Sequence, residues 1–144
     1  MNIFQFVIPK SLVATLSVES TVRQALETMK FHRYSALPVI DRDGVYVGTV
    51  REGDLFRYFM ENNAFDISKA EQYPVKKIMS KNDNPPLFHT ASLKDLIEQV
   101  KEHNFVPVVD DRGCFIGIIL RREVLSYLIR FLPDDEKRTQ DKSI

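Results

Sequence analysis

The residues best suited to chemistry lie in two short stretches of this 144-residue sequence, each where a predicted strand ends and a predicted helix begins. In the first stretch, Gly48, Arg51 and Asp54 follow one another at three-residue intervals. The Asp54 carboxylate has two acceptor oxygens that can bind a pair of hydroxyl groups, and the Arg51 guanidinium can grip a phosphate through two parallel hydrogen bonds. This stretch therefore indicates a local site for a polar, anionic small molecule.

The second stretch repeats this pattern in a weakened form. Gly117, Leu120 and Glu123 keep the same spacing, but the acid is one methylene longer and the middle residue is apolar. Arg121 and Arg122 add two cations beside the start of the predicted helix, where unpaired N–H groups and the helix dipole also favour an anion. The two stretches predict two unequal sites, and whether both bind a ligand stays open.

Each of these residues also has a purely structural interpretation. An Asp at a helix start is explained by capping alone, which contributes ~1 kcal/mol. The two roles of Asp54 can coexist if one oxygen caps the helix and the other faces a cleft. Glu123 is interpreted as a solvated acid of the first helical turn, and isolated arginines are usually solvated surface charges.

Signatures of catalysis and of metal binding are absent from the sequence. There is no Ser-His-Asp or Cys-His arrangement and no phosphate-binding glycine loop. His32, His89 and His103 share no short spacing with clustered Cys or acidic residues. We therefore expect no enzyme, no required cofactor and no metal. The single cysteine, Cys114, excludes an internal disulfide and favours a cytoplasmic location.

Composition excludes several further classes of protein. Twenty Lys and Arg residues balance twenty Asp and Glu residues, so no global positive field attracts nucleic acid or an anionic membrane. The longest apolar stretches have about seven residues, far fewer than the ~20 needed to span a bilayer. The N-terminal residues lack the features of a secretory signal. We expect no nucleic-acid partner and no membrane insertion.

The sequence contains one long internal repeat. The segment FQFVIPK, which starts at residue 4, matches VKKIMSK, which starts at residue 75, at an offset of 71. Further along, LPVIDRDGVYVGTV from residue 37 aligns without a gap on VPVVDDRGCFIGII from residue 106, at an offset of 69. A repeat of this length that occurs twice indicates a tandem duplication. We expect the two copies to pack as a pseudo-symmetric pair.

Each copy has the same predicted elements. Helix-capping signals, Ser20 or Thr21 in one copy and Ser92 with Asp95 in the other, are followed by apolar residues at helical spacing. Short β-branched runs around an Asp- and Gly-containing turn then predict a hairpin. The predicted helices cover residues 21–32, 53–62, 92–103 and 122–132, and the predicted hairpins cover 37–50 and 106–120. The predicted units are repeat 1 (1–63), a connector (64–73), repeat 2 (74–132) and a flexible tail (133–144).

With these elements in place, the chain resembles a tandem pair of cystathionine β-synthase (CBS) domains of the stand-alone bacterial type. The resemblance rests on the V-x-x-I-M opening at Val75–Met79, on Ala25-Leu26, on the L-P-V-I-D strand at Leu37–Asp41 and on the Gly48–Asp54 stretch. It covers residues 3–132. It implies an α+β fold in which each repeat is a small three-stranded sheet with two helices, and in which the two sheets face each other and leave two clefts.

The resemblance also implies a function and assigns the site. CBS pairs bind adenosine-containing ligands, so we expect a regulatory module for AMP, ATP, S-adenosylmethionine or cyclic di-AMP that signals to an effector protein and forms a homodimer. The family's acid holds the ribose, which assigns that role to Asp54, while Arg51 replaces the family's Ser or Thr. Thr15 and Ala36 are further ligand-binding candidates, and Glu123, Arg121 and Arg122 are the candidates in the second cleft.

Two observations bear on which version of this function is expected. The segment GIILRREVL, residues 117–125, resembles that of cyclic di-AMP receptors. The departure of the second motif from the family pattern favours an alternative, a structural homodimerisation or scaffold module with vestigial clefts.

Overall fold

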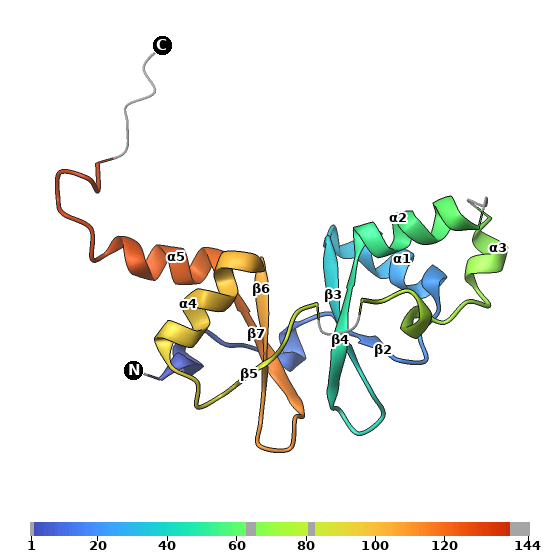
Figure 1. Ribbon diagram of the computed structural model, residues 1–144, viewed down its shortest axis with the longest axis horizontal. Helices are drawn as coiled ribbons and strands as arrows, with labels where there is room; N and C mark the ends of the chain where they lie inside the picture. The colour runs from blue at the N-terminus through green and yellow to red at the C-terminus, as the bar shows by residue number, and fades with distance from the viewer. Residues whose placement is uncertain (1, 63–65, 81–82, 139–144) are drawn as a thin grey trace, which may run out of the picture.

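The computed structural model describes residues 2–62, 66–80 and 83–138 of the chain. It contains two α/β units side by side, each a small sheet with helices on its outer face (Figure 1). The first unit contains β2 (Leu16–Ser17), α1 (Val22–His32), β3 (Ala36–Ile40), β4 (Tyr46–Arg51) and α2 (Glu52–Glu61). The second contains β5 (Leu87–Phe88), α4 (Leu93–Glu102), β6 (Phe105–Val109), β7 (Phe115–Leu120) and α5 (Arg121–Ile129). The predicted α+β class is confirmed.

The helix starts follow from local side-chain chemistry. The Thr21 hydroxyl accepts a hydrogen bond from the Gln24 N–H, and the Gln24 side chain accepts one from the Thr21 N–H. Ser92 and Asp95 form the same reciprocal pair at the start of α4. Each pair satisfies two backbone donors that the helix leaves unpaired, so α1 and α4 begin within one residue of their predicted starts.

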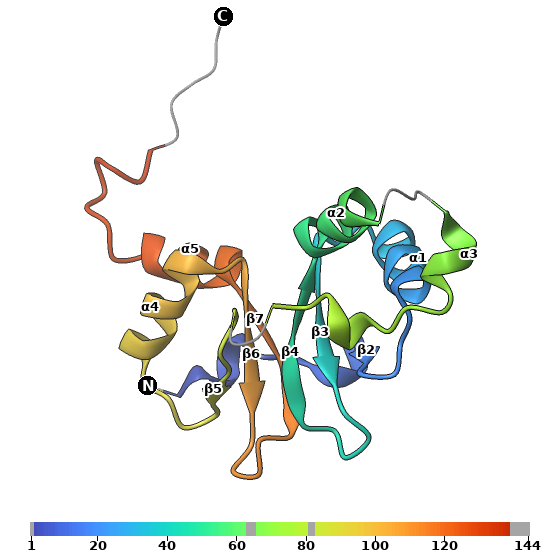
Figure 2. The same cartoon turned by 45° about the vertical axis from the view of Figure 1, so that its right-hand side comes forward.

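The two hairpins are built alike and contact each other. Gly44 and Gly113 both have positive φ angles, of 82° and 80°, which residues with a side chain rarely adopt. The backbone N–H of Tyr46 donates to the Gly113 carbonyl (3.1 Å), and the N–H of Phe115 donates to the Gly44 carbonyl (2.8 Å). The hairpins therefore project on the same side of the molecule, as Figures 1 and 2 both show.

The two sheets differ by one strand. Among the residues that the structure describes, the first repeat has the expected three strands in the order β2-β3-β4, whereas the second has four in the order β1-β7-β6-β5. The additional strand, β1 (Ile8–Pro9), comes from the N-terminal segment and pairs antiparallel with β7 of the other repeat. The corresponding later segment makes the reciprocal contact, because Ser80 forms an isolated bridge with Thr49 of β4.

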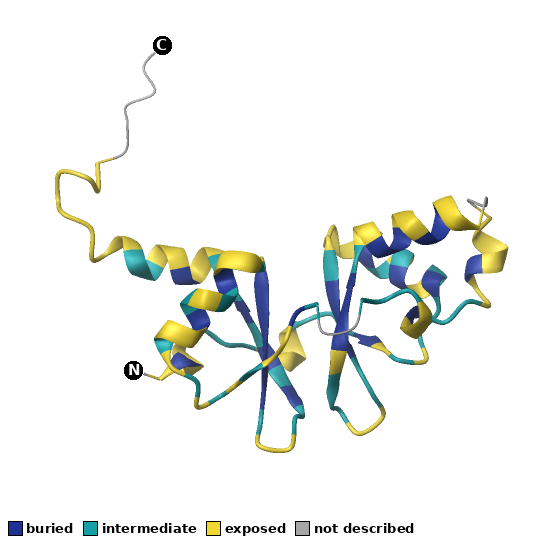
Figure 3. Ribbon diagram, viewed as in Figure 1, coloured by how far each residue is buried: buried dark blue, intermediate teal, exposed yellow. Residues whose placement is uncertain are grey.

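The opening segment of each repeat also contributes a buried side chain to the core of the other repeat. Ile3 is fully buried in the core of the second repeat, beside Leu96 and Val100. Val75 is fully buried in the core of the first repeat. Burying such a side chain stabilises the fold by about 1.5–3 kcal/mol, so each core depends on a segment that belongs in sequence to the other copy. Figure 3 shows the buried residues concentrated on the central strands and on the inner helix faces.

The segments outside the repeats are simpler. In the predicted connector lies a short helix, α3 (Ile67–Ala70), whose Ala70 is buried in the first core. Of the predicted tail, residues 133–138 are exposed, and residues 139–144 lie outside the described part of the chain. The predicted unit boundaries stay predictions. Within residues 2–62, 66–80 and 83–138, no helix is both long and apolar enough to cross a lipid bilayer.

Candidate ligand cleft between the repeats

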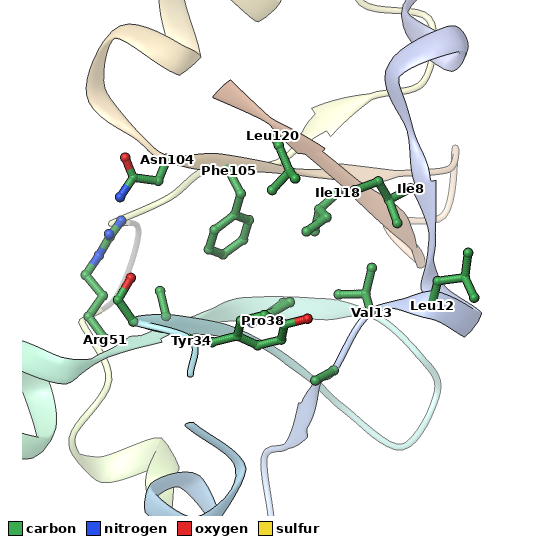
Figure 4. A pocket seen from close by; sticks show the side chains of 13 residues that line it. Ile8, Leu12, Val13, Tyr34, Pro38, Arg51, Asn104, Phe105, Ile118 and Leu120 are labelled. Atoms are coloured by element: carbon green, nitrogen blue, oxygen red, sulfur yellow. The ribbon is translucent and has the colours of Figure 1, made fainter. Parts of the chain in front are cut away.

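A cavity of about 230 Å³ lies between the two sheets. Figure 4 shows two apolar walls facing each other across it, one from each repeat. The first repeat supplies Val13, Ala36 and Pro38, and the second supplies Phe105, Ile118 and Leu120. Two parallel apolar walls suit a flat ring, because both of its faces then lose contact with water.

The cavity has one polar end. Arg51 and Asn104 lie together at this end, and Ile8 and Leu12 lie at the opposite end (Figure 4). Of the described residues that line the cavity, Arg51 alone carries a charge. The arrangement therefore suits a molecule with a flat apolar body and a polar or anionic group at one end.

Arg51 is held by two further side chains. Its Nε donates to the Asp83 carboxylate, and its Nη2 lies 3.0 Å from Nδ1 of His103. A guanidinium can only donate, so Nδ1 of His103 is the acceptor and the ring is neutral in this arrangement. Burial, followed by the nearby Arg51 charge, lowers the pKa of His103 below its ordinary value of 6.5.

Asp54 is buried beside the cleft but does not line the cavity. One carboxylate oxygen accepts from the Arg51 N–H (2.8 Å), and the other accepts from the Ser80 hydroxyl (3.2 Å). The side chain is 3% exposed and borders a smaller polar hollow with Arg57 and Tyr58. One oxygen thus caps α2, as the structural interpretation expects, and the other oxygen also has a partner. The ribose-binding role of Asp54 stays a prediction.

Of the other candidates of the first cleft, two line the cavity and one does not. Ala36 lines the cavity, as does Arg51. Thr15 does not line it, although its neighbour Ala14 does. Ala36 is placed here by the pairing of β3 with β4, which sets Ala36 directly opposite Arg51.

The candidates of the second stretch have structural partners. Nε of Arg121 donates to the carbonyls of Val100 (2.7 Å) and His103 (3.2 Å), so this cation satisfies the last turn of α4. Glu123 is exposed in the first turn of α5, and its carboxylate lies 3.8 Å from Nε of the exposed Arg122. None of these three side chains lines the cavity, and their ligand-binding roles stay predictions.

Several cavity residues belong to no motif of the sequence. Leu12, Tyr34, Asn104 and Phe105 all line the cleft, yet none belongs to a recognised spacing. The repeat register contained one usable signal, since Asn104 corresponds to Ser35 at the offset of 69, and both line the cavity. Equivalent residues just before equivalent strands are expected to meet where two pseudo-symmetric sheets face each other.

At the counterpart of this cavity, a buried residue of the chain bridges the two repeats. At the offset of 71, Leu12 and Val13 correspond to Asp83 and Asn84. Asn84 is 2% exposed, and its side-chain amide donates to the Phe105 carbonyl of the second repeat (3.1 Å). Its backbone carbonyl accepts from the Tyr46 hydroxyl of the first repeat (2.8 Å). Asn84 therefore bridges the two repeats.

Burial of this bridge changes the pKa of the Tyr46 hydroxyl. The Tyr46 hydroxyl also lies 2.7 Å from the hydroxyl of the fully buried Thr49. Desolvation by burial raises the pKa of Tyr46 to about 12, so the hydroxyl keeps its proton at neutral pH and can donate to Asn84. The side-chain oxygen of Asn84 has no hydrogen-bond partner within the described part of the chain.

A duplicated α/β unit whose copies enclose a largely apolar cleft with one cationic end defines a paired ligand-binding module. The family model of the CBS domain matches residues 8–61 and 75–130, so the chain belongs to the CBS domain family. This match confirms the resemblance stated from the sequence.

Three known proteins are similar over most of the chain. A CBS domain-containing protein of Dictyostelium discoideum is 29% identical over 82% of this chain and 86% of its own. Cyclic di-AMP receptor B of Bacillus subtilis is 27% identical over 86% of this chain and 84% of its own. The crystal structure of CBSX2 in complex with AMP is 25% identical, with a TM-score of 0.73, and the match covers 90% of this chain and 97% of that one.

Proposed function

We propose that the chain is a regulatory module that binds an adenine nucleotide in the cavity between its repeats. The observation that carries the proposal is the combination of two facing apolar walls with the single cation Arg51 at one end. An adenine ring would lie between Phe105 on one wall and Ala36 and Pro38 on the other. Stacking of a base on an aromatic side chain contributes about 1–3 kcal/mol and suits a buried flat ring.

The phosphate of the nucleotide would bind at the Arg51 end. A guanidinium and a phosphate form charge-assisted hydrogen bonds, which are about twice as strong as neutral ones. Asn104 lies at the same end and can donate or accept hydrogen bonds. This pairing of a stacked base with a charged end selects for nucleotides over uncharged aromatic molecules.

The relatives support the adenosine class. One is a receptor for cyclic di-AMP, and another was crystallised with AMP. We propose AMP, ATP, S-adenosylmethionine and cyclic di-AMP as the set to test, with the nucleotide acting as a regulatory ligand. The expectations of no enzymatic activity, no required cofactor, no nucleic-acid partner and a cytoplasmic location stay predictions from the sequence.

Signalling would follow from binding between the repeats. A ligand that touches both repeats favours the arrangement in which its two walls are closest, and so shifts the population of inter-repeat arrangements. We propose an effector protein as the partner. It would bind the outer surface with an affinity that depends on the arrangement of the repeats.

The helical face of the module supports the proposal of a homodimer. Phe56 and Met60 of α2 are exposed, and so are Leu125 and Ile129, which stand at the equivalent positions of α5 at the offset of 69. Exposed apolar side chains in a pseudo-symmetric pair can form a self-complementary surface, as a two-fold dimer requires.

Calorimetric titration with the four ligands tests the proposed function. We expect at least one of them to bind, and we expect Ala36→Phe to weaken that binding at least about tenfold, because the new ring fills the space between the walls. Val47→Phe is the matched control, since Val47 is exposed and does not line the cavity. Mass spectrometry of small molecules released from the denatured protein would identify a ligand that co-purifies.

Melting temperatures measured with and without nucleotide distinguish this function from that of a scaffold with vestigial clefts. The bridge that Asn84 forms between the repeats in the second cleft is the observation that favours the scaffold. A melting temperature that rises with added nucleotide supports the regulatory module. A melting temperature that depends on protein concentration and ignores all four ligands supports the scaffold and contradicts the module.

A further inference from the structure

We propose that Asp83 sets the selectivity of the cleft, because its carboxylate competes with the anionic group of a ligand for Arg51. The inference rests on the proposed function, since it concerns the charged end of the same cavity. It adds a residue that lies outside the cavity lining and outside the motif. The selectivity concerned is the affinity for a phosphate-bearing ligand relative to that for its uncharged form.

Arg51 is the cation that both the Asp83 carboxylate and the phosphate of a ligand would bind. The Arg51 side chain lines the cavity, while its Nε is engaged by the Asp83 carboxylate and its Nη2 by His103. A phosphate that takes the Nε edge of the guanidinium must displace Asp83. A phosphate that takes the other edge is held close to a carboxylate of the same sign. In both cases the ligand's anion binds more weakly than it would to an unpaired arginine.

The ion pair is weak enough to be displaced. The side chains of Arg51 and Asp83 are 31% and 36% exposed, so solvent screens their attraction. Asp83 therefore lowers the affinity for an anion without abolishing it.

The repeat register argues that the pair is not required for the fold. Leu12 stands at the position equivalent to Asp83, and Leu120 stands at the position equivalent to Arg51. Two leucines thus stand where the other half of the molecule has an ion pair. This asymmetry makes the charge of Asp83 removable with little structural cost.

Titration with two probes that differ by one phosphate tests the inference. AMP and adenosine are titrated into the wild-type chain and into Asp83→Asn. We expect the substitution to tighten AMP binding by about 5-fold, which is the scale of a partly exposed ion pair, and to leave adenosine binding unchanged. Asp43→Asn is the matched control, since it removes the same charge from the exposed turn of the first hairpin and should change neither affinity.

A second substitution separates competition from a general charge effect. Arg51→Leu copies the residue of the other repeat and should bring the affinity for AMP down to that for adenosine. In the double variant with Asp83→Asn, the gain for AMP should disappear, because the group that is competed for is gone.

The outcomes distinguish the inference from the proposed function. An unchanged ratio of AMP to adenosine affinity in Asp83→Asn overturns the role of Asp83 and leaves the module intact. An equal gain in Asp43→Asn also overturns it, because the effect would then be one of net charge. If neither AMP nor adenosine, nor the other three ligands of the set, binds the wild-type chain, the proposed function and this inference fall together.

Discussion

The two clefts implied by the duplication differ, because one forms a cavity and the other holds a buried residue that bridges the repeats. Leu12 and Val13 border the open cleft, whereas Asp83 and Asn84 stand at the equivalent positions in the other half. Asn84 is buried there and hydrogen-bonded to both repeats. Duplication of a fold therefore provides two equivalent places, and a few side chains decide what each of them contains.

The two motif glycines give the sharpest contrast between the repeats. A Cβ added to Gly117 would lie 2.2 Å from the backbone oxygen of Ile8 and 2.7 Å from a methyl group of Val7. Backbone cannot move aside cheaply, so we expect Gly117→Ala to lower the free energy of unfolding by about 3 kcal/mol. Urea denaturation followed by circular dichroism measures the loss.

Gly48→Ala is the matched control in the other repeat. Its added Cβ would lie 3.1 Å from the terminal methyl group of Met79, a flexible side chain. We expect a change within about 1 kcal/mol. Equal losses for the two variants would contradict the difference between the two contacts, in which β1 pairs with β7 whereas Ser80 forms an isolated bridge with Thr49.

The polar bridge that Asn84 forms in the second cleft predicts a smaller effect on the free energy of unfolding. Tyr46→Phe copies Phe115, its equivalent in the second repeat, and removes the hydroxyl that bonds to the Asn84 carbonyl and to Thr49. Both groups are buried, so we expect a loss of about 1–2 kcal/mol in the same denaturation experiment. Tyr34→Phe, in the open cleft, should change stability little. Equal losses of stability in Tyr46→Phe and Tyr34→Phe would mean that this bridge does not stabilise the second cleft.

The smallest expected effect is a pH dependence that comes from His103. Arg51, Asp83, Glu102 and Arg121 are the charged groups that act on this ring, and burial is the largest cause of its lowered pKa. The unfolded chain takes up the proton near the ordinary pKa of 6.5, whereas the folded chain does so at lower pH. The contribution of His103 to stability is therefore complete above pH 6.5 and is lost as the pH falls through the folded pKa.

His103→Gln removes this titration. Thermal unfolding between pH 7.5 and pH 5 should show a less steep decline for the variant than for the wild type. His32→Gln, at the end of the equivalent helix, leaves the contact between Arg51 and His103 in place and serves as the control. A wild-type profile that His103→Gln does not alter would show that the ring is not coupled to folding.

Much of the fold could be predicted because the signals are local. The reciprocal caps of Thr21 with Gln24 and of Ser92 with Asp95 act across three residues, and both helices begin where these residues indicate. The hairpin turns depend on Gly44 and Gly113, whose positive φ angles suit glycine. The repeat also predicted that the second copy would reproduce the first, and it does so in its helices and hairpins.

The candidate site was predicted less completely. Arg51 and Ala36 line the cavity, and their ligand-binding roles stay predictions, whereas Asp54, the residue on which the motif centres, has both oxygens engaged beside it. The Ser80 hydroxyl that binds Asp54 lies 26 residues further along the chain. No spacing rule could anticipate this contact, because it depends on the exchange of the opening segments.

The amino-acid sequence by itself determined the duplication, the order of elements in each copy and the family, since these follow from short-range preferences and from identities in register. Only the tertiary structure decided that β1 joins the sheet of the other repeat, that Asp83 and His103 meet at Arg51, and that one cleft stays open. The physical reason is that these contacts join residues distant in sequence. Their formation depends on how the two sheets pack against each other, and a linear pattern does not contain that information.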